Sequence, residues 1–141
     1  MSKSEDKYLD FLRDNVPFHE GIFTSLKCGR ECNKILPPGN DISWTKGSII
    51  GGLIGGPWGY LYGQARPAES LQKLCRNICR LQVLEKEGAN PIEIIKTKEK
   101  IKALRKVVEK WIQKFENSEP EKAKKLRDRM NMLLRHKFEV G

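Results

Sequence analysis

The chain has 141 residues, which is enough for one modest domain with appendages and too few for a large multidomain protein. Hydrophobic residues make up 38 per cent and charged residues 32 per cent, so the apolar core that the chain can bury is small. Residues 1–46 carry equal numbers of basic and acidic side chains, and the whole net charge of +9 lies in residues 47–141. No secretory signal, Arg-rich presequence or lipidation motif is visible, so we expect any membrane anchor to be internal.

Two helices are predicted in the N-terminal part. The first covers about residues 5–16 and ends before Pro17, with a set of apolar side chains on one face: Tyr8, Leu9, Leu12 and Val16. The second covers about residues 18–36, and we expect five side chains along one side of it: Phe18, Ile22, Leu26, Cys28 and Cys32. Pro37 and the four residues after it then break the helix.

The most unusual stretch is residues 47–65, which holds 19 residues without one charged side chain. Its glycines recur at a strict spacing of four: Gly47, Gly51, Gly55, Gly59 and Gly63. Residues four apart lie along one face of an α-helix, so a helical run would present a groove without side chains. Stripes of this kind let helices pack closely in membranes. The sequence therefore predicts a helix-packing or membrane-contacting segment, which we call the glycine run.

Length and composition leave two interpretations of the glycine run open. A helix of 19 residues spans roughly 28 Å, close to the ~30 Å hydrocarbon core of a bilayer, and Trp44, Tyr60 and Tyr62 near its ends suit a membrane interface. Pro57 and seven glycines disfavour an uninterrupted helix, so a soluble packing segment or loop is the alternative. If the run crosses a bilayer, the basic excess after it favours a cytoplasmic or matrix position for the C-terminal side.

Three helices are predicted after the glycine run, and no strand pattern of any strength appears, so the expected fold class is all-α. These helices cover about residues 68–87, 91–117 and 119–138. Gly88 suits a helix C-terminus and Asn90 an N-cap. The short connection between the last two helices predicts an antiparallel coiled hairpin. The expected segments are the N-terminal helices at 1–46, the glycine run at 47–65, a helix at 66–89 and a basic hairpin at 90–141.

The helix at about 91–117 carries a heptad repeat, with Thr97 as its polar exception. Six apolar residues form its coiled face: Ile94, Ile101, Leu104, Val108, Trp111 and Phe115. We expect this face to bind a partner protein. The inward positions expected on the last helix are Ala123, Leu126, Met130 and Leu133 or Leu134.

The four cysteines form two pairs of equal spacing, Cys28 with Cys32 and Cys75 with Cys79. This spacing places both members of a pair on one helix face, on consecutive turns. Two such helices packed antiparallel could join Cys28 to Cys79 and Cys32 to Cys75 as two parallel rungs. Reduced cysteines in an apolar core and a four-cysteine zinc site are the alternatives. A glycine run that crosses a bilayer once would separate the two pairs and prevent their joining.

The paired motifs resemble those of the small Tim chaperones of the mitochondrial intermembrane space. The resemblance covers residues 8–87 and rests on the sequences LKCGREC at 26–32 and ESLQKLCRNIC at 69–79. It implies a helical hairpin whose cysteines are oxidised after import without a cleavable presequence. Where the family has a short loop between its motifs, 42 residues lie between Cys32 and Cys75 here.

No residue pattern typical of an active site, a metal site or a cofactor site stands out. His19 and His136 lie far apart, and the sequence GGLIGG at 51–56 follows no predicted strand. We therefore expect a non-enzymatic protein with no cofactor, metal or small-molecule substrate. The basic helices after residue 90 predict solvated or anionic-lipid-facing surfaces, because the interleaved aromatic residues that would favour nucleic acid are missing.

Taken with the small core, these features favour an accessory or structural subunit of a membrane protein assembly of the respiratory-chain type. The expected location is the mitochondrial inner membrane or intermembrane space. Its partners would be other protein subunits, reached through the glycine run and the C-terminal hairpin, together with lipid. The alternatives are a soluble Tim-like chaperone for hydrophobic precursors and a basic helical nucleic-acid-binding protein.

Overall fold

The computed structural model describes residues 20–44, 58, 61–63, 65–88 and 90–139. Its elements are α2 (Glu20–Ile35), the 3-10 helix η2 (Gly39–Ile42), α4 (Pro67–Glu87), α5 (Pro91–Ser118) and α6 (Pro120–Arg135). Every element is helical and the described residues contain no strand, which confirms the predicted all-α class. The helix predicted at about 5–16 lies outside the described residues.

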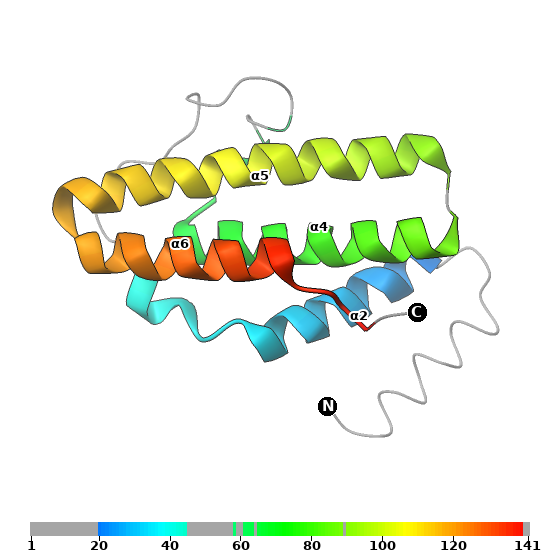
Figure 1. Ribbon diagram of the computed structural model, residues 1–141, viewed down its shortest axis with the longest axis horizontal. Helices are drawn as coiled ribbons and strands as arrows, with labels where there is room; N and C mark the ends of the chain where they lie inside the picture. The colour runs from blue at the N-terminus through cyan, green and yellow to red at the C-terminus, as the bar shows by residue number, and fades with distance from the viewer. Residues whose placement is uncertain (1–19, 45–57, 59–60, 64, 89, 140–141) are drawn as a thin grey trace.

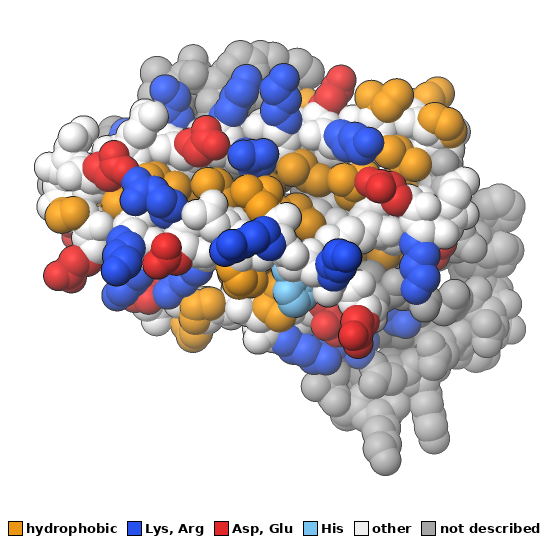
Figure 2. Space-filling model, in the orientation of Figure 1, with side chains coloured by type: hydrophobic (Ala, Val, Ile, Leu, Met, Phe, Trp, Pro, Cys, Tyr) orange, Lys and Arg blue, Asp and Glu red, His pale blue; other side chains and the backbone are white. Residues whose placement is uncertain are grey.

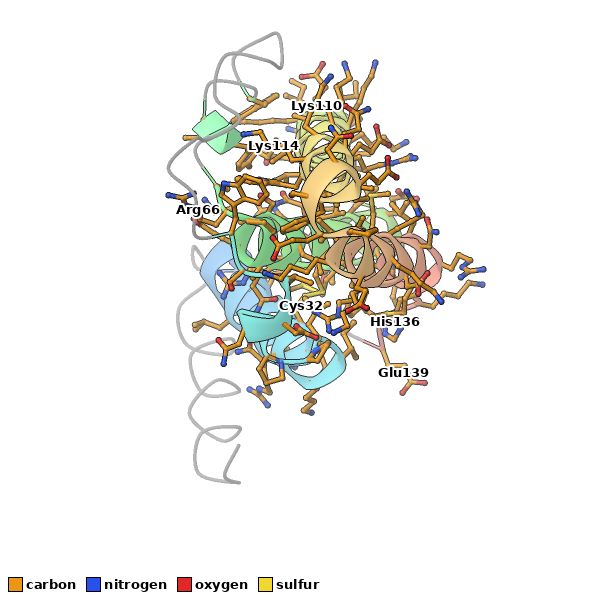
Figure 3. The ribbon with its side chains drawn as sticks, turned by 90° about the vertical axis from the view of Figure 1, so that its left-hand side faces the viewer. Cys32, Arg66, Lys110, Lys114, His136 and Glu139 are labelled. Atoms are coloured by element: carbon orange, nitrogen blue, oxygen red, sulfur yellow. A yellow bond between two sulfur atoms is a disulfide. The ribbon has the colours of Figure 1, made fainter. Side chains whose placement is uncertain are left out.

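Helices α4, α5 and α6 form a three-helix bundle. The long helix α5 packs along both α4 and α6, and it occupies one side of the bundle in Figures 1 and 3. Helix α2 packs against α4 on the side away from α5. The bundle therefore forms the body of the described protein, and α2 is an addition held chiefly by α4.

The core lies along the shared axis of the bundle. Its largest fully buried side chains include Trp111 and Phe115 of α5, Leu74 of α4, and Leu126 and Leu133 of α6. Each such side chain stabilises the fold by about 1.5–3 kcal/mol relative to an exposed position. The inward positions predicted on the last helix are confirmed, and the four that are buried are Ala123, Leu126, Met130 and Leu133.

The helix boundaries follow local capping chemistry. Gly88 ends α4 in the left-handed region (φ 65°), and the Asn90 side chain caps α5 by accepting a hydrogen bond of 2.9 Å from the Ile92 amide. Glu119 alone separates α5 from α6, so the predicted antiparallel hairpin is confirmed. Its last helix is shorter than predicted, because the chain turns extended at His136.

The extended C-terminal segment is held by one side chain of α4. The Gln82 amide nitrogen donates to the His136 carbonyl at 2.8 Å, and its oxygen accepts from the Phe138 backbone N–H at 2.7 Å. The Gln82 side chain thus pairs two backbone groups that would have formed hydrogen bonds within α6 if the helix had continued by another turn. His136 is the C-cap of α6.

Two predicted faces need correction. Leu26 is half exposed. It precedes Cys28 by two positions, and residues two apart lie on roughly opposite sides of a helix, so Leu26 faces away from the side of α2 that carries the cysteines. The coiled face of α5 is not free for a partner protein, since Leu104, Val108, Trp111 and Phe115 are completely buried between the helices of the bundle. Ile94 and Ile101 are only half-buried.

Candidate functional site

Two disulfides join α2 to α4 as parallel rungs. Cys28 bonds to Cys79 and Cys32 bonds to Cys75, with Cα–Cα distances of 5.6 and 5.9 Å. The four cysteines are buried, and Cys32 lies between α2 and the bundle in Figure 3. The pairing runs in opposite directions along the two helices, so α2 and α4 are antiparallel. These two bonds, which we call the disulfide ladder, are one of the arrangements that the spacing allowed.

The outer rung of the ladder has its own small apolar cluster. Cys28, Cys79 and Val83 are buried together, and Phe138 from the C-terminal segment packs against them. The inner rung belongs to the main core through Cys32 and Cys75. The ladder thus connects α2 both to the bundle and to the end of the chain.

The disulfide ladder decides between the alternatives left open by the sequence. Disulfide sulfurs are not thiolates, so these cysteines neither bind zinc nor act as reduced core residues here. Because covalent bonds join the two flanks of the glycine run, both flanks lie on the same side of any membrane. A single crossing by residues 47–65 is therefore excluded, and the orientation inferred from the basic excess does not apply.

Only part of the glycine run is described. Gly47, Gly51, Gly55 and Gly59 lie outside the described residues, so the predicted glycine face is untested. Gly63 is described and is buried in a turn. Beside it Tyr62 is buried in the core, whereas Leu61 is half exposed.

The two flanks of the glycine run meet on Trp111 of α5. The Trp44 ring lies 5.5 Å from the Trp111 ring and 5.4 Å from the Phe115 ring, both between centroids. On the other flank, the Trp111 indole N–H donates a 2.9 Å hydrogen bond to the carbonyl of Ala65. Trp111 is completely buried, so this bond forms away from water, where an unpaired donor would be unfavourable. We call Trp44, Trp111 and Ala65 the tryptophan anchor.

Cationic side chains lie over the aromatic rings beside the tryptophan anchor. The Lys114 ammonium lies 5.4 Å from the Trp44 ring and 5.2 Å from the Trp111 ring, at the end of the bundle seen in Figure 3. The Lys100 ammonium lies 4.9 Å from the Trp58 ring. Burial lowers the pKa of Lys100, and the neighbouring positive charge of Lys96 lowers it further.

An ion pair fixes the chain just before Trp44. Arg129 of α6 donates two hydrogen bonds to the Asp41 carboxylate, at 2.9 and 2.5 Å. These hydrogen bonds are the main reason that the Asp41 pKa lies below its ordinary value, with the charges of Arg129 and Lys125 as further causes. The stabilisation is present above the ordinary carboxyl pKa and is lost as the pH falls through the lowered value.

Close backbone packing holds the same segment against α4. A Cβ added at Gly39 would lie only 2.3 Å from the Cβ of Ala68, so the absence of a side chain lets η2 approach α4. Lys122 of α6 also donates a 2.9 Å hydrogen bond to the carbonyl of Ser43. The chain is therefore held in place as far as Ser43.

The described residues contain no group of histidine, cysteine and acidic side chains that would hold a metal ion. A cleft of about 470 Å³ lies between the end of α2, η2 and α4, and both polar and apolar residues line it. Its charged lining residues are Glu69 and Arg129, and Arg129 is already bound to Asp41. No helix in the described part of the chain is long and apolar enough to span a bilayer.

Sequence reasoning found the cysteines but missed the tryptophan anchor and the Asp41–Arg129 pair. The sequence positions of Trp44 and Tyr62 suit a membrane interface, whereas in the structure both pack with the protein core. The available signal is that Trp44 lies shortly before the uncharged run and Ala65 is its last residue. Their common partner lies 46 residues further on than Ala65, and no local pattern indicates it.

Comparisons with protein-family models, with curated proteins and with solved structures return no match to this chain.

The disulfide ladder predicts a definite result for thiol labelling. Protein that is unfolded without reductant should take up no alkylating groups, and protein reduced first should take up four, as measured by the mass of the intact chain. Replacing Cys32 and Cys75 together by serine should lower the free energy of unfolding by about 2–4 kcal/mol, because the loop that the bond closes is long. Labelling of the unreduced protein would contradict the ladder.

The tryptophan anchor predicts a local effect of Trp111→Phe. The variant keeps a ring against Trp44 but removes the shorter of two hydrogen bonds to the buried Ala65 carbonyl, which then keeps only the 3.3 Å bond from the Ser70 hydroxyl, and it leaves space where the larger indole was. The free energy of unfolding should therefore fall by about 1–3 kcal/mol. Amide hydrogen exchange around Ala65 should rise more than exchange in α2. The matched control is Trp58→Phe, which removes the same atoms from a half-buried ring, and equal effects of the two variants would argue against the anchor.

Proposed function

We propose that this protein is a non-enzymatic accessory subunit of a membrane protein assembly. In this proposal the helical body presents the glycine run to neighbouring subunits. The proposal assigns no reaction, cofactor or metal to the chain. The observation that carries it is the tryptophan anchor, because Trp44 and Ala65 bring both flanks of the run to one buried side chain. A segment that is uncharged throughout and held at both flanks suits a contact with apolar partners.

The disulfide ladder supports a location in an oxidising compartment. Disulfides persist where thiols are not kept reduced, as in the secretory pathway, the periplasm and the mitochondrial intermembrane space. The resemblance of the CX3C pairs to the small Tim proteins favours the last of these. We propose that the helical body lies on the intermembrane-space side of the inner membrane, with the respiratory chain as the class of assembly that it joins.

The buried coiled face changes which surface meets a partner. Since Leu104, Trp111 and Phe115 fill the bundle, the hairpin of α5 and α6 serves as support for the glycine run rather than as an open docking face. The contact with other subunits is then assigned to the run alone. This makes the function depend on the glycine spacing, which can be tested directly.

Replacing Gly51 and Gly55 together by leucine should release the protein from its assembly. The change keeps the run apolar and raises its helix propensity, but the added side chains would block close backbone approach, at a cost of about 1–3 kcal/mol per site. The measurement is a native gel after mild detergent solubilisation. The matched control introduces the same leucines one position earlier, at Ile50 and Ile54, and should stay in the assembly. Full retention of the glycine variant would show that the glycine face is no contact surface.

A soluble Tim-like chaperone is the second candidate, and the disulfide ladder between antiparallel helices favours it. The two functions differ in the fraction that holds the protein. The accessory subunit should migrate with a membrane assembly after mild solubilisation, because apolar contacts keep it there. A chaperone should be recovered from the soluble intermembrane-space fraction and should protect a hydrophobic peptide from aggregation. Recovery entirely in the soluble fraction would contradict the accessory-subunit proposal.

A further inference from the structure

The first turns of α5 expose two large apolar side chains. Ile92 is 70 per cent and Ile95 is 57 per cent exposed, and residues three apart are neighbours on a helix surface. Figure 2 shows hydrophobic side chains gathered at this end of α5. Most isoleucines of folded proteins are buried, so an adjacent exposed pair indicates a contact surface.

The exposure follows from unequal helix lengths. Helix α5 has 28 residues and α6 has 16, and the two are joined by one residue. The antiparallel α6 therefore ends about 18 Å short of the start of α5. The first turns of α5 therefore pack against α4 but not against α6. The side of these turns that faces away from α4 is not covered by α6.

Basic side chains continue the same surface along α5. Lys98, Lys102, Arg105 and Lys106 are exposed, and with Ile101 and Glu109 they line a shallow pocket of about 360 Å³. No ion pair joins these four cations to an acidic residue within the described part of the chain. By contrast, Arg129 is paired with Asp41. The positive charge on α5 is therefore available to an external anion.

We propose that this surface, which we call the α5 outer face, docks onto an anionic phospholipid membrane. It consists of Ile92, Ile95, Lys98, Lys102, Arg105 and Lys106. The isoleucines enter the boundary between headgroups and acyl chains, and the cations contact lipid phosphates. Amphipathic surface helices bind membranes through this combination of apolar insertion and attraction to anionic headgroups. The face extends over about 21 Å of helix, long enough to contact several headgroups.

The composition of the face favours lipid over a nucleic acid. A nucleic acid could form ion pairs with the lysines and the arginine through its phosphates, but it offers no apolar environment for Ile92 and Ile95. Single-stranded nucleic acid is gripped by stacked aromatic side chains, and the α5 outer face contains none. A bilayer surface supplies phosphate and hydrocarbon side by side. The inference concerns a different surface from the glycine run and does not depend on the function proposed for that run.

The test is flotation of the full-length oxidised protein with phosphatidylcholine vesicles, with and without phosphatidylserine. The protein should bind the vesicles that contain phosphatidylserine, and added salt should weaken this binding. Replacing Ile92 and Ile95 together by serine should weaken it roughly tenfold, because apolar insertion is lost. Replacing Lys98 and Lys102 together by glutamate should weaken it roughly tenfold or more. The exposed positions of all four residues leave the fold intact, which circular dichroism would check.

The matched control reverses the same number of charges elsewhere. Lys124 and Lys137 are exposed and have no ion pair in the described part of the chain, so replacing both by glutamate should retain binding within about threefold. Equal loss in this control would overturn the proposal, because net charge alone would then explain binding. Unchanged binding of the isoleucine variant would also overturn it. So would binding to DNA by a protein that ignores the anionic vesicles.

Discussion

The structure depends on the two covalent bonds between α2 and α4. Among the described helices, α2 packs chiefly on α4, and the disulfide ladder holds it there through four buried cysteines. Closing two long loops restricts the unfolded chain and so stabilises the fold. The same bonds place both flanks of the glycine run on one side of any membrane. The disulfide bonds thereby exclude a single crossing of a bilayer by the uncharged segment between the cysteines.

The small core explains why the anchoring contacts matter. Three helices share one apolar centre, and Trp111 occupies it as its largest buried side chain. Through its ring it holds Trp44, and through its N–H it holds the Ala65 carbonyl. One buried indole thus serves the bundle and both flanks of the glycine run. Aromatic rings suit this double use because they combine a large apolar area with one polar donor.

The positive charges of the described residues differ in whether an acidic side chain pairs with them. Several cations of α6 pair with acids of other elements, as Arg127 does with Glu116 and Arg129 with Asp41, and these pairs join elements to one another. On the outer side of α5 the cations have no such partners in the described residues. The paired charges stabilise the fold, because they join its elements. The cations of α5 that have no acidic partner can attract an anionic surface, as the proposed membrane contact requires.

The sequence by itself determined the helical class and the three helices expected at about 68–87, 91–117 and 119–138, the last of which is shorter in the structure. It also determined the cap at Asn90, the stop at Gly88 and the short hairpin connection, because each of these depends on neighbours within a few residues. It also placed Cys28 and Cys32 on one face, but three chemical outcomes fitted that spacing. Only the tertiary structure chose the disulfide ladder, since the choice depends on which helix packs beside α2. It also turned the predicted partner face of α5 into the core, because an apolar heptad does not say whether its neighbour belongs to the same chain. The tryptophan anchor and the Asp41–Arg129 pair join residues 46 or more positions apart, and such contacts arise only when the bundle brings them together.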